Sequence, residues 1–239
     1  MAEYITNDTD LKSVADAIRA KTGKTDPLTY PTEFVSEIAG IETGGTDTLE
    51  ARMNNTMTEY SNSGIVTIPE YGFAGQSKLE TVSLPNLTTM KTYAFCGCTA
   101  LSNISFPKLK AINGANIFRD CRSLTEFITN ENFNSRLDAS AFEGCTELQK
   151  VDFYHINTLG IGGYALACQN LVTAIFRNTD FVPQINAAAF GGATTKMNAG
   201  QGYIYVPGSA IDQYKVATNW AKYADQIRAI EDYPEITGG

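Results

Sequence analysis

The sequence predicts an α/β repeat solenoid, in which short strands stack coil upon coil between helical ends. One observation is a cysteine that recurs 23, 24 and 23 residues apart, at Cys98, Cys121, Cys145 and Cys168. A second is a series of large apolar residues spaced by 22 to 24 positions: Phe73, Phe95, Phe118, Phe142, Leu166 and Phe190. A third is the alternation of apolar and polar residues further along each repeat, as in Val82-Ser-Leu84. A period in this range indicates stacked coils, because each coil returns the chain to the same place one layer further along.

Composition narrows the class of protein. The 239 residues are 43% hydrophobic and 18% charged, which excludes wholesale disorder. No apolar stretch approaches the roughly 18 residues that cross a bilayer, so we expect no membrane insertion. The first ten residues hold neither a basic nor an apolar segment, so we expect no signal peptide. A net charge of −8 repels phosphate backbones, and nucleic acid is therefore not an expected partner.

In chain order, residues 1–45 are expected to form two short amphipathic helices. Asp8 or Asp10 can cap the first helix, which ends at Gly23, and the second carries three apolar residues: Phe34, Ile38 and Ile41. Two helices of this size bury little core between them, so they should pack on a neighbour. Residues 46–60 are expected to form the junction to the repeats.

Residues 61–199 are expected to form the solenoid. In the first coil Val82 and Leu84 point inward while Thr81 and Ser83 point outward. A second apolar group in several coils, such as Leu109 to Ile112 or Ile156 to Leu159, predicts a strand or turn on the opposite wall. The third coil carries an insertion near residues 129–133, and the sixth lacks the cysteine half of the repeat.

Residues 200–239 are expected to form a strand followed by a helical cap. The strand covers residues 203–207, and Ser209 can cap a helix that includes Ile211 and Tyr214. Residues 219–227 show apolar spacing typical of a second helix and include Trp220, which we interpret as a residue of the cap core.

The cysteine spacing favours free, buried thiols over disulfides. Equivalent residues of neighbouring coils lie about one strand spacing apart, which fits disulfide geometry poorly. We therefore expect reduced thiols and synthesis in a reducing cytoplasm.

Motifs for catalysis or cofactor binding are incomplete. Gly23-Lys24-Thr25 ends like a phosphate-binding loop, but Ile18 stands where that motif needs glycine. Cys96 and Cys98 supply two thiolates, whereas structural zinc needs four ligands. A nucleophilic system would have to recruit the only histidine, His155. We expect no enzyme activity, no metal and no cofactor.

Two family resemblances follow from these motifs. The unit Ala141-Phe-Glu-Gly-Cys145-Thr-Glu-Leu148-Gln-Lys-Val151-Asp-Phe153, with its repeats, resembles the BspA-type leucine-rich-repeat family over about residues 61–207. This resemblance implies a leucine-rich-repeat array with a helical C-terminal cap, which the predicted short N-terminal helices precede. Residues 10–23 and 27–41 are similar to an N-terminal module on tail and fibre proteins of phages and prophages of Gram-positive hosts. That second resemblance implies attachment to a particle.

Outward strand positions form the candidate binding surface. They stack into two columns, one with Thr81, Asn103, Glu126, Lys150 and Thr173, the other with Ser83, Ser105, Ile128, Asp152 and Ile175. Tyr154 and Arg177 flank the columns. Such a face suits a polar polymer or a protein, and the alternative is a solvated sheet face without a ligand.

Two functions agree with these patterns. The first, implied by resemblance, is a non-enzymatic phage tail protein in the virion. Residues 1–45 would dock to a tail or baseplate protein, and the repeat face would recognise a host surface polysaccharide or protein. The alternative is a bacterial BspA-like adhesion or protein-interaction module in the cytoplasm or, by a non-classical route, on the cell surface. A homo-oligomer is compatible with either function.

Overall fold

The computed structural model describes residues 54–237. The expected N-terminal helices, the attachment module of residues 1–45 and the junction up to residue 53 lie outside these residues. The predictions made for them are therefore not addressed by the fold.

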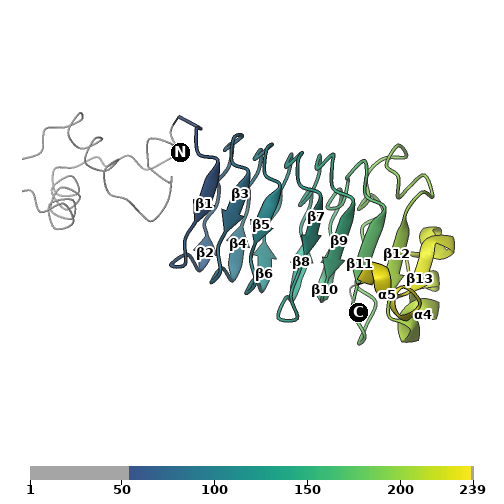
Figure 1. Ribbon diagram of the computed structural model, residues 1–239. Coiled ribbons are helices and arrows are strands. Elements are labelled where there is room, and N and C mark those ends of the chain that lie inside the picture. The colour runs from purple at the N-terminus through teal and green to yellow at the C-terminus, as the bar shows by residue number, and fades with distance from the viewer. Residues whose placement is uncertain (1–53, 238–239) are drawn as a thin grey trace, which may run out of the picture.

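The described residues form a β-solenoid whose coils stack side by side along one axis (Figure 1). The outer wall consists of β1 (Glu59–Ser61), β3 (Thr81–Ser83), β5 (Asn103–Ser105), β7 (Glu126–Ile128), β9 (Lys150–Phe153), β11 (Thr173–Phe176), β12 (Tyr203–Val206) and β13 (Ile227–Ala229). The opposite wall consists of β2 (Thr67–Ile68), β4 (Thr89–Lys91), β6 (Ala111–Asn113), β8 (Ser135–Leu137) and β10 (Ile156–Ile161). These strands confirm the solenoid and the strands predicted on both walls.

Among residues 54–237 the paired strands run parallel, and paired outer-wall strands align each residue with its equivalent in the next coil. Thr81 lies opposite Asn103, for example, and Glu126 lies opposite Lys150. Neither wall is one continuous sheet. The outer wall divides into β1-β3-β5 and β7-β9-β11-β12-β13, and the opposite wall divides into β2-β4-β6 and β8-β10.

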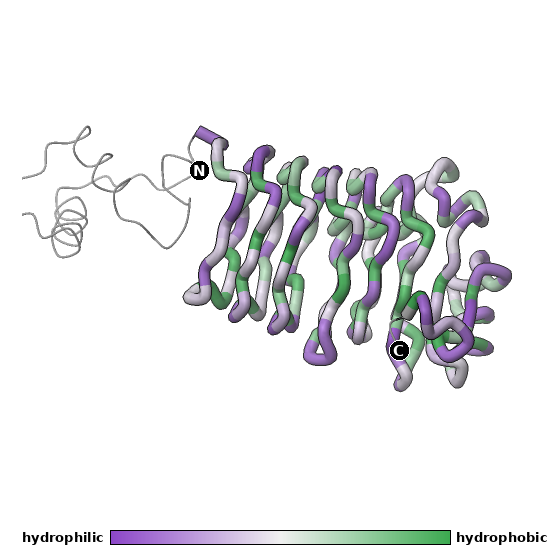
Figure 2. Tube along the Cα trace, in the orientation of Figure 1, coloured by the Kyte–Doolittle hydropathy of each residue, from purple (hydrophilic) through white to green (hydrophobic). Residues whose placement is uncertain are grey.

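The core is a column of phenyl rings enclosed by inward strand residues. Phe95 stacks on Phe73 and Phe118 with ring centroids 5.0 and 5.3 Å apart, and Phe118 stacks on Phe142 at 5.2 Å. Val82 and Leu84 are fully buried as predicted. Figure 2 shows the resulting alternation of hydrophobic and hydrophilic residues along the coils. The sequence period therefore assigns the interior correctly.

The predicted strand over Ile156 to Leu159 is confirmed as β10, although Leu159 itself is exposed. β10 pairs with β8 through Ile156 and Ile161 with a register shift between them. The shift places the intervening residues outside the regular ladder.

The four repeated thiols form a buried ladder. Each Sγ donates a hydrogen bond to a phenylalanine carbonyl of the preceding coil: Cys98 to Phe73, Cys121 to Phe95, Cys145 to Phe118 and Cys168 to Phe142, at 3.0–3.2 Å. All five cysteines are free, which confirms the expected absence of disulfides. Burial raises the pKa of Cys98 to about 12 and raises the pKa of the other three repeated thiols above their ordinary value.

We expect this ladder to resist alkylation in the native state, because the thiolate is the reactive form and burial disfavours it. Iodoacetamide at pH 8, followed by mass spectrometry, should modify the half-buried Cys96 first. The four repeated thiols should react only after denaturant is added. Rapid labelling of all four in the folded protein would contradict the ladder.

Short helical elements gather after the last repeat. They are the 3₁₀ helices η1 (Gly208–Ala210), η2 (Ala221–Gln226) and η3 (Ile230–Asp232), and the α-helices α4 (Ile211–Val216) and α5 (Pro234–Thr237). Two predictions are wrong here. Ser209 makes no capping bond because α4 begins after Ala210, and the expected helix over residues 219–227 is a 3₁₀ helix that ends where Ile227 joins β13.

Trp220 is a core residue of this segment, as predicted. Its indole is buried between Phe176 and Tyr214, and its Nε1 donates to the carbonyl of Pro183 at 2.7 Å. The α part of the predicted α/β class is confined, within residues 54–237, to these short C-terminal elements.

Candidate functional site

The first predicted column lies on the outer wall as expected. The strand register aligns Thr81 with Asn103, Glu126 with Lys150, and Lys150 with Thr173. Asn103 and Glu126 are exposed, whereas Thr81, Lys150 and Thr173 are half-buried. The column therefore presents hydroxyl, amide and charged groups along one face.

The second predicted column is only partly exposed. Ser83, Ser105 and Ile128 reach solvent, and Ile128 is 53% exposed. Asp152 and Ile175 are 5% and 0% exposed. The prediction that these two residues belong to an open surface is wrong.

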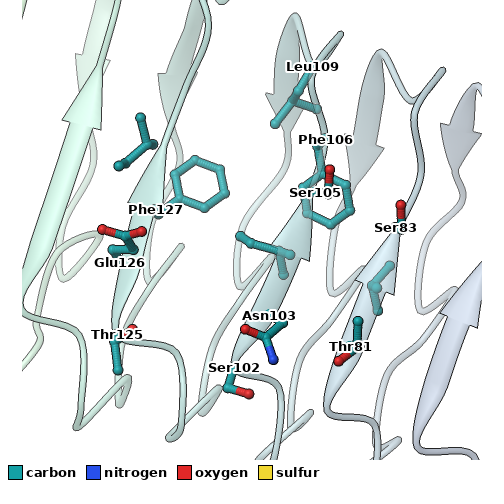
Figure 3. A pocket seen from close by; sticks show the side chains of 13 residues that line it. Thr81, Ser83, Ser102, Asn103, Ser105, Phe106, Leu109, Thr125, Glu126 and Phe127 are labelled. Carbon is teal, nitrogen blue, oxygen red and sulfur yellow. The ribbon is translucent and has the colours of Figure 1, made fainter. Parts of the chain in front are cut away.

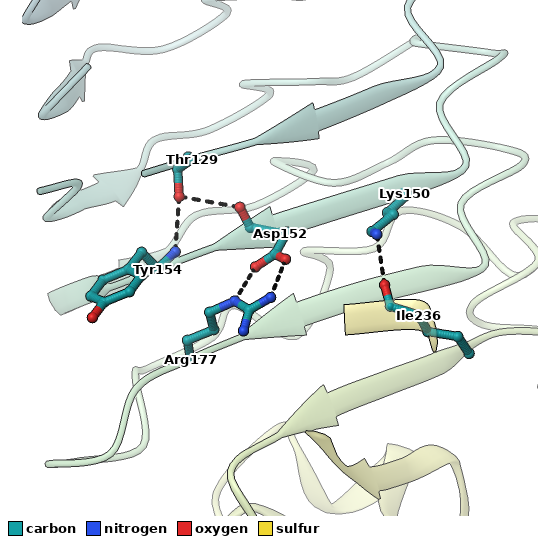
Figure 4. A network of polar contacts seen from close by, with 6 residues as sticks. All are labelled: Thr129, Lys150, Asp152, Tyr154, Arg177 and Ile236. Carbon is teal, nitrogen blue, oxygen red and sulfur yellow. Dashed lines mark hydrogen bonds and ion pairs between the residues drawn. The ribbon is translucent and has the colours of Figure 1, made fainter. Parts of the chain in front are cut away.

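Asp152 is covered by the flanking residue Arg177. The guanidinium donates two hydrogen bonds to the carboxylate, from Nε at 2.8 Å and from Nη2 at 2.7 Å (Figure 4). The bond to Asp152 is the main reason why the pKa of Arg177 is raised. Bidentate pairs of this kind have fixed geometry, so Arg177 joins two coils instead of remaining available to a ligand.

The C-terminal segment, residues 230–237, lies over the outer wall of the last coils. Lys150 Nζ donates to the carbonyl of Ile236 at 2.7 Å, and Figure 4 shows α5 beside the strands at this point. The ring of Tyr233 packs edge-on against Tyr205, with centroids 5.3 Å apart. In the same region Ile175 lies on β11 between Asp152 of β9 and Tyr205 of β12. The open part of the outer wall is consequently that of β1 to β7.

A groove of about 310 Å³ opens in this exposed part, between β5 and β7 (Figure 3). It lies where the outer wall divides into two sheets. The six exposed or half-exposed residues predicted on β3, β5 and β7 all line it: Thr81, Ser83, Asn103, Ser105, Glu126 and Ile128. Its volume is at the lower end of the roughly 300–1,000 Å³ range of small-ligand pockets.

The groove marks an interrupted hydrogen-bond ladder. At other boundaries of the outer wall, one carbonyl accepts from two successive amides of the next coil: Thr58 from Glu80 and Thr81, Glu80 from Ser102 and Asn103, Thr125 from Gln149 and Lys150, and Gln149 from Val172 and Thr173. Continued in register, Ser102 O would accept from Thr125 N and Glu126 N. Within residues 54–237 no such bonds are present.

A second set of backbone groups is unpaired beyond the strands. Leu84 N donates to Ser105 O and Thr129 N donates to Asp152 O at neighbouring boundaries. The equivalent bond from Phe106 N to Ile128 O is missing among the described residues. Strand edges with free donors and acceptors therefore face each other across the groove.

The side chains on either side of this boundary differ in size and in contacts. Phe127 occupies the inward strand position where the adjacent coils carry Ile104 and Val151. Its ring packs on Phe142 of the next coil at 4.9 Å, and the Thr129 hydroxyl donates to Asp152 O of that coil. Both contacts hold the third coil to the fourth. Ile104 is left half-buried, whereas its equivalent Val82 is fully buried.

On the opposite wall, a side chain joins the same two coils. Ser135 Oγ accepts from Ile112 N and donates to Ile112 O, both at 3.1 Å, and bridges β6 and β8. The two coils thus remain in contact on one wall while they separate on the other.

The lining of the groove is hydroxyl-rich with one ionisable side chain, Glu126. Glu126 and the column residues were predicted from the sequence, whereas Ser102, Thr125 and Phe106, whose backbone groups face the groove, were not. Phe127 was the available signal, since a phenylalanine stands between Ile104 and Val151 at the inward strand position.

The fold of residues 54–237 does not bring together a set of side chains that could form a metal site. Among residues 54–237, no three His, Cys, Asp or Glu side chains are placed to hold a metal ion. His155 packs edge-on against Phe181 and has Asp180 4.0 Å from its Nδ1. None of the helices in residues 54–237 has the length and hydrophobicity that a membrane span requires.

Comparison with protein families matches residues 60–197 to the BspA-type leucine-rich repeat region, in six copies. The match covers more than half of the 239 residues. No curated protein matches the chain.

Similar solved structures include the pneumococcal vaccine antigen PcpA, at 16% identity and a TM-score of 0.50. The alignment covers 72% of this chain but only 40% of that structure. A Treponema protein described as T. pallidum leucine-rich repeat protein aligns at 21% identity and a TM-score of 0.36, over 62% of this chain and 84% of its own. A leucine-rich cell surface protein of Faecalibacterium prausnitzii aligns at 16% identity and a TM-score of 0.27, over 72% and 62%. At these identities the likeness to PcpA supports the fold alone.

Proposed function

The chain belongs to the BspA-type leucine-rich repeat family, and on this premise we propose that it is a non-enzymatic protein-interaction module that binds through the open outer wall of β1 to β7. The main observation that supports this proposal is the groove between β5 and β7. It is lined by six residues that were predicted to lie on the surface, and backbone groups along it are unpaired. A rigid scaffold with a few exposed polar groups is suited to recognition. We also propose that the C-terminal elements shield the last coil, because the ends of a solenoid need a covered apolar face.

A phage tail role remains a prediction that the fold does not support. The family match begins at residue 60 and includes no tail module. Docking to a tail or baseplate protein rests on residues 1–45, which lie outside the described residues. Location in a virion, in the cytoplasm or on a cell surface is likewise a proposal.

Site-specific photo-cross-linking tests the proposed surface. A benzoylphenylalanine at the exposed Asn103 should cross-link a defined partner in cells that produce the protein, because Asn103 lines the groove. The matched control is the same replacement at Asn113, an exposed asparagine on β6 of the opposite wall. Glu126→Lys should remove the Asn103 product.

The outcome separates the candidate functions. A cell-surface or cytoplasmic protein as partner supports the interaction module, and a phage structural protein supports the tail reading. Equal products from Asn103 and Asn113, or none from Asn103, would show that the outer wall of β1 to β7 is not the binding surface.

A further inference from the structure

We infer that the groove between β5 and β7 receives an extended polypeptide segment of a partner, which pairs as an additional parallel strand. This inference rests on the proposed function and names its ligand class. The groove differs from an ordinary sheet face in one respect, because both of its walls are strand edges with unpaired backbone groups.

The unpaired groups are complementary to a peptide backbone. The third-coil wall offers two amide donors, Thr125 N and Glu126 N, followed by one acceptor, Ile128 O. The second-coil wall offers the acceptor Ser102 O and the donor Phe106 N. A strand can donate and accept along both of its edges, and strand addition of this kind uses main-chain bonds for affinity.

Edge pairing and direction favour a strand. Strand edges with unpaired N–H and C=O groups are a template for pairing with another chain, so a peptide that bonds to these five groups gains main-chain hydrogen bonds. Every strand of the outer wall is parallel to its neighbours, which sets the direction of the added strand. Below the strand edges, Ile104 and Phe127 line the floor and can contact an inward apolar side chain.

Charge indicates the preferred residue opposite β7. Glu126 is the one ionisable side chain of the lining, and inside the protein its other cross-strand neighbour is Lys150. Opposite charges at directly paired positions stabilise a sheet. The partner segment should therefore carry a lysine or arginine in register with Glu126.

The probe is a fluorescent synthetic peptide that copies residues 147–155. In the protein this segment contains β9, which already pairs in parallel along both edges, and it places Lys150 in register with Glu126. Fluorescence anisotropy with the purified full chain should show saturable binding. The same peptide N-methylated at Lys150, Val151 and Asp152 should bind at least tenfold more weakly, since it keeps the side chains but loses the backbone donors.

A matched pair of protein variants locates the site. Ser105→Trp fills the groove, whereas Ser61→Trp places the same side chain in the same column on β1, away from the groove. Both serines are exposed, so both variants should fold, which circular dichroism checks. We expect Ser105→Trp to weaken peptide binding at least tenfold and Ser61→Trp to change it by less than about twofold.

Amide hydrogen exchange by NMR tests the open ladder without any ligand. Thr125 N and Glu126 N should exchange much faster than their equivalents Gln149 N and Lys150 N, which are hydrogen-bonded to Thr125 O. The peptide should slow both amides. Slow exchange in the free protein would mean that the ladder is closed and would overturn the inference.

The other possible results of these experiments also test strand addition. Absence of peptide binding, equal binding of the N-methylated peptide, or equal effects of the two tryptophan variants would each reject strand addition. Binding of an oligosaccharide but not of the peptide would reject it as well. Because the peptide assay needs no natural partner, its failure is distinguishable from failure of the cross-linking experiment, which tests the wider surface.

Discussion

Phe142→Ala should lower the free energy of unfolding by about 3–5 kcal/mol, the largest effect that we expect from a single side chain. The ring of Phe142 is fully buried and packs on Phe118 at 5.2 Å and on Phe127 at 4.9 Å. Its own backbone is held in the ladder, with Phe142 N donating to Ala165 O at 2.9 Å. The coil cannot collapse into the space, so a cavity term adds to the lost transfer free energy.

Denaturant unfolding followed by circular dichroism measures this loss, with two leucines as a matched pair. Leu148→Ala removes a fully buried side chain of the same coil and should cost about 2–5 kcal/mol. Leu159→Ala removes a side chain that is 67% exposed and should cost less than about 0.5 kcal/mol. A loss below about half a kcal/mol for Phe142→Ala or Leu148→Ala would show that the coil register is wrong.

Gly160→Ala should destabilise the solenoid by roughly 2–5 kcal/mol, the sum of a left-handed backbone penalty and overpacking. Gly160 has a φ of +73°, and an added Cβ would overlap the carbonyl oxygen of Gln184 in the next coil. That oxygen accepts the hydrogen bond from Ile161 N at 2.8 Å, so the methyl group would disturb a contact between coils.

Gly75→Ala separates the two contributions. Gly75 has a similar φ of +76°, but an added Cβ would meet no atom within 4 Å. It should therefore cost only the backbone term, about 1–2 kcal/mol. Thermal unfolding of the two variants measures the difference, and equal losses would contradict the close approach at Gly160.

The interior of this protein could be predicted from its sequence because each coil places apolar residues at the same positions of the repeat. The recurrence of Phe95, Phe118 and Phe142 and of the cysteines after them assigned a layer to the repeated core residues. The columns on the outer wall followed from the same register, since alternate strand residues point to opposite faces. Trp220 was assigned correctly as a core residue by its apolar spacing.

Elements outside the repeat were predicted less well. Residues 219–227 have helical spacing, yet they form a 3₁₀ helix that gives way to β13 because Ile227 pairs with Ile204 on the edge of the outer wall. The pattern of apolar residues within this segment could not predict its strand pairing with the solenoid. Weak local preferences yield to such contacts in short elements.

What the sequence by itself determined was the period, the inward residues and the chemistry of the exposed column. Only the tertiary structure decided which part of that column is open, because Arg177 covers Asp152 and residues 230–237 lie over the outer wall near Lys150. Only the tertiary structure revealed the groove, because the hydrogen bonds that join neighbouring outer-wall strands are missing between β5 and β7. Repetition of a pattern fixes what is common to all coils, whereas a gap between two of them depends on how unequal side chains pack across the boundary.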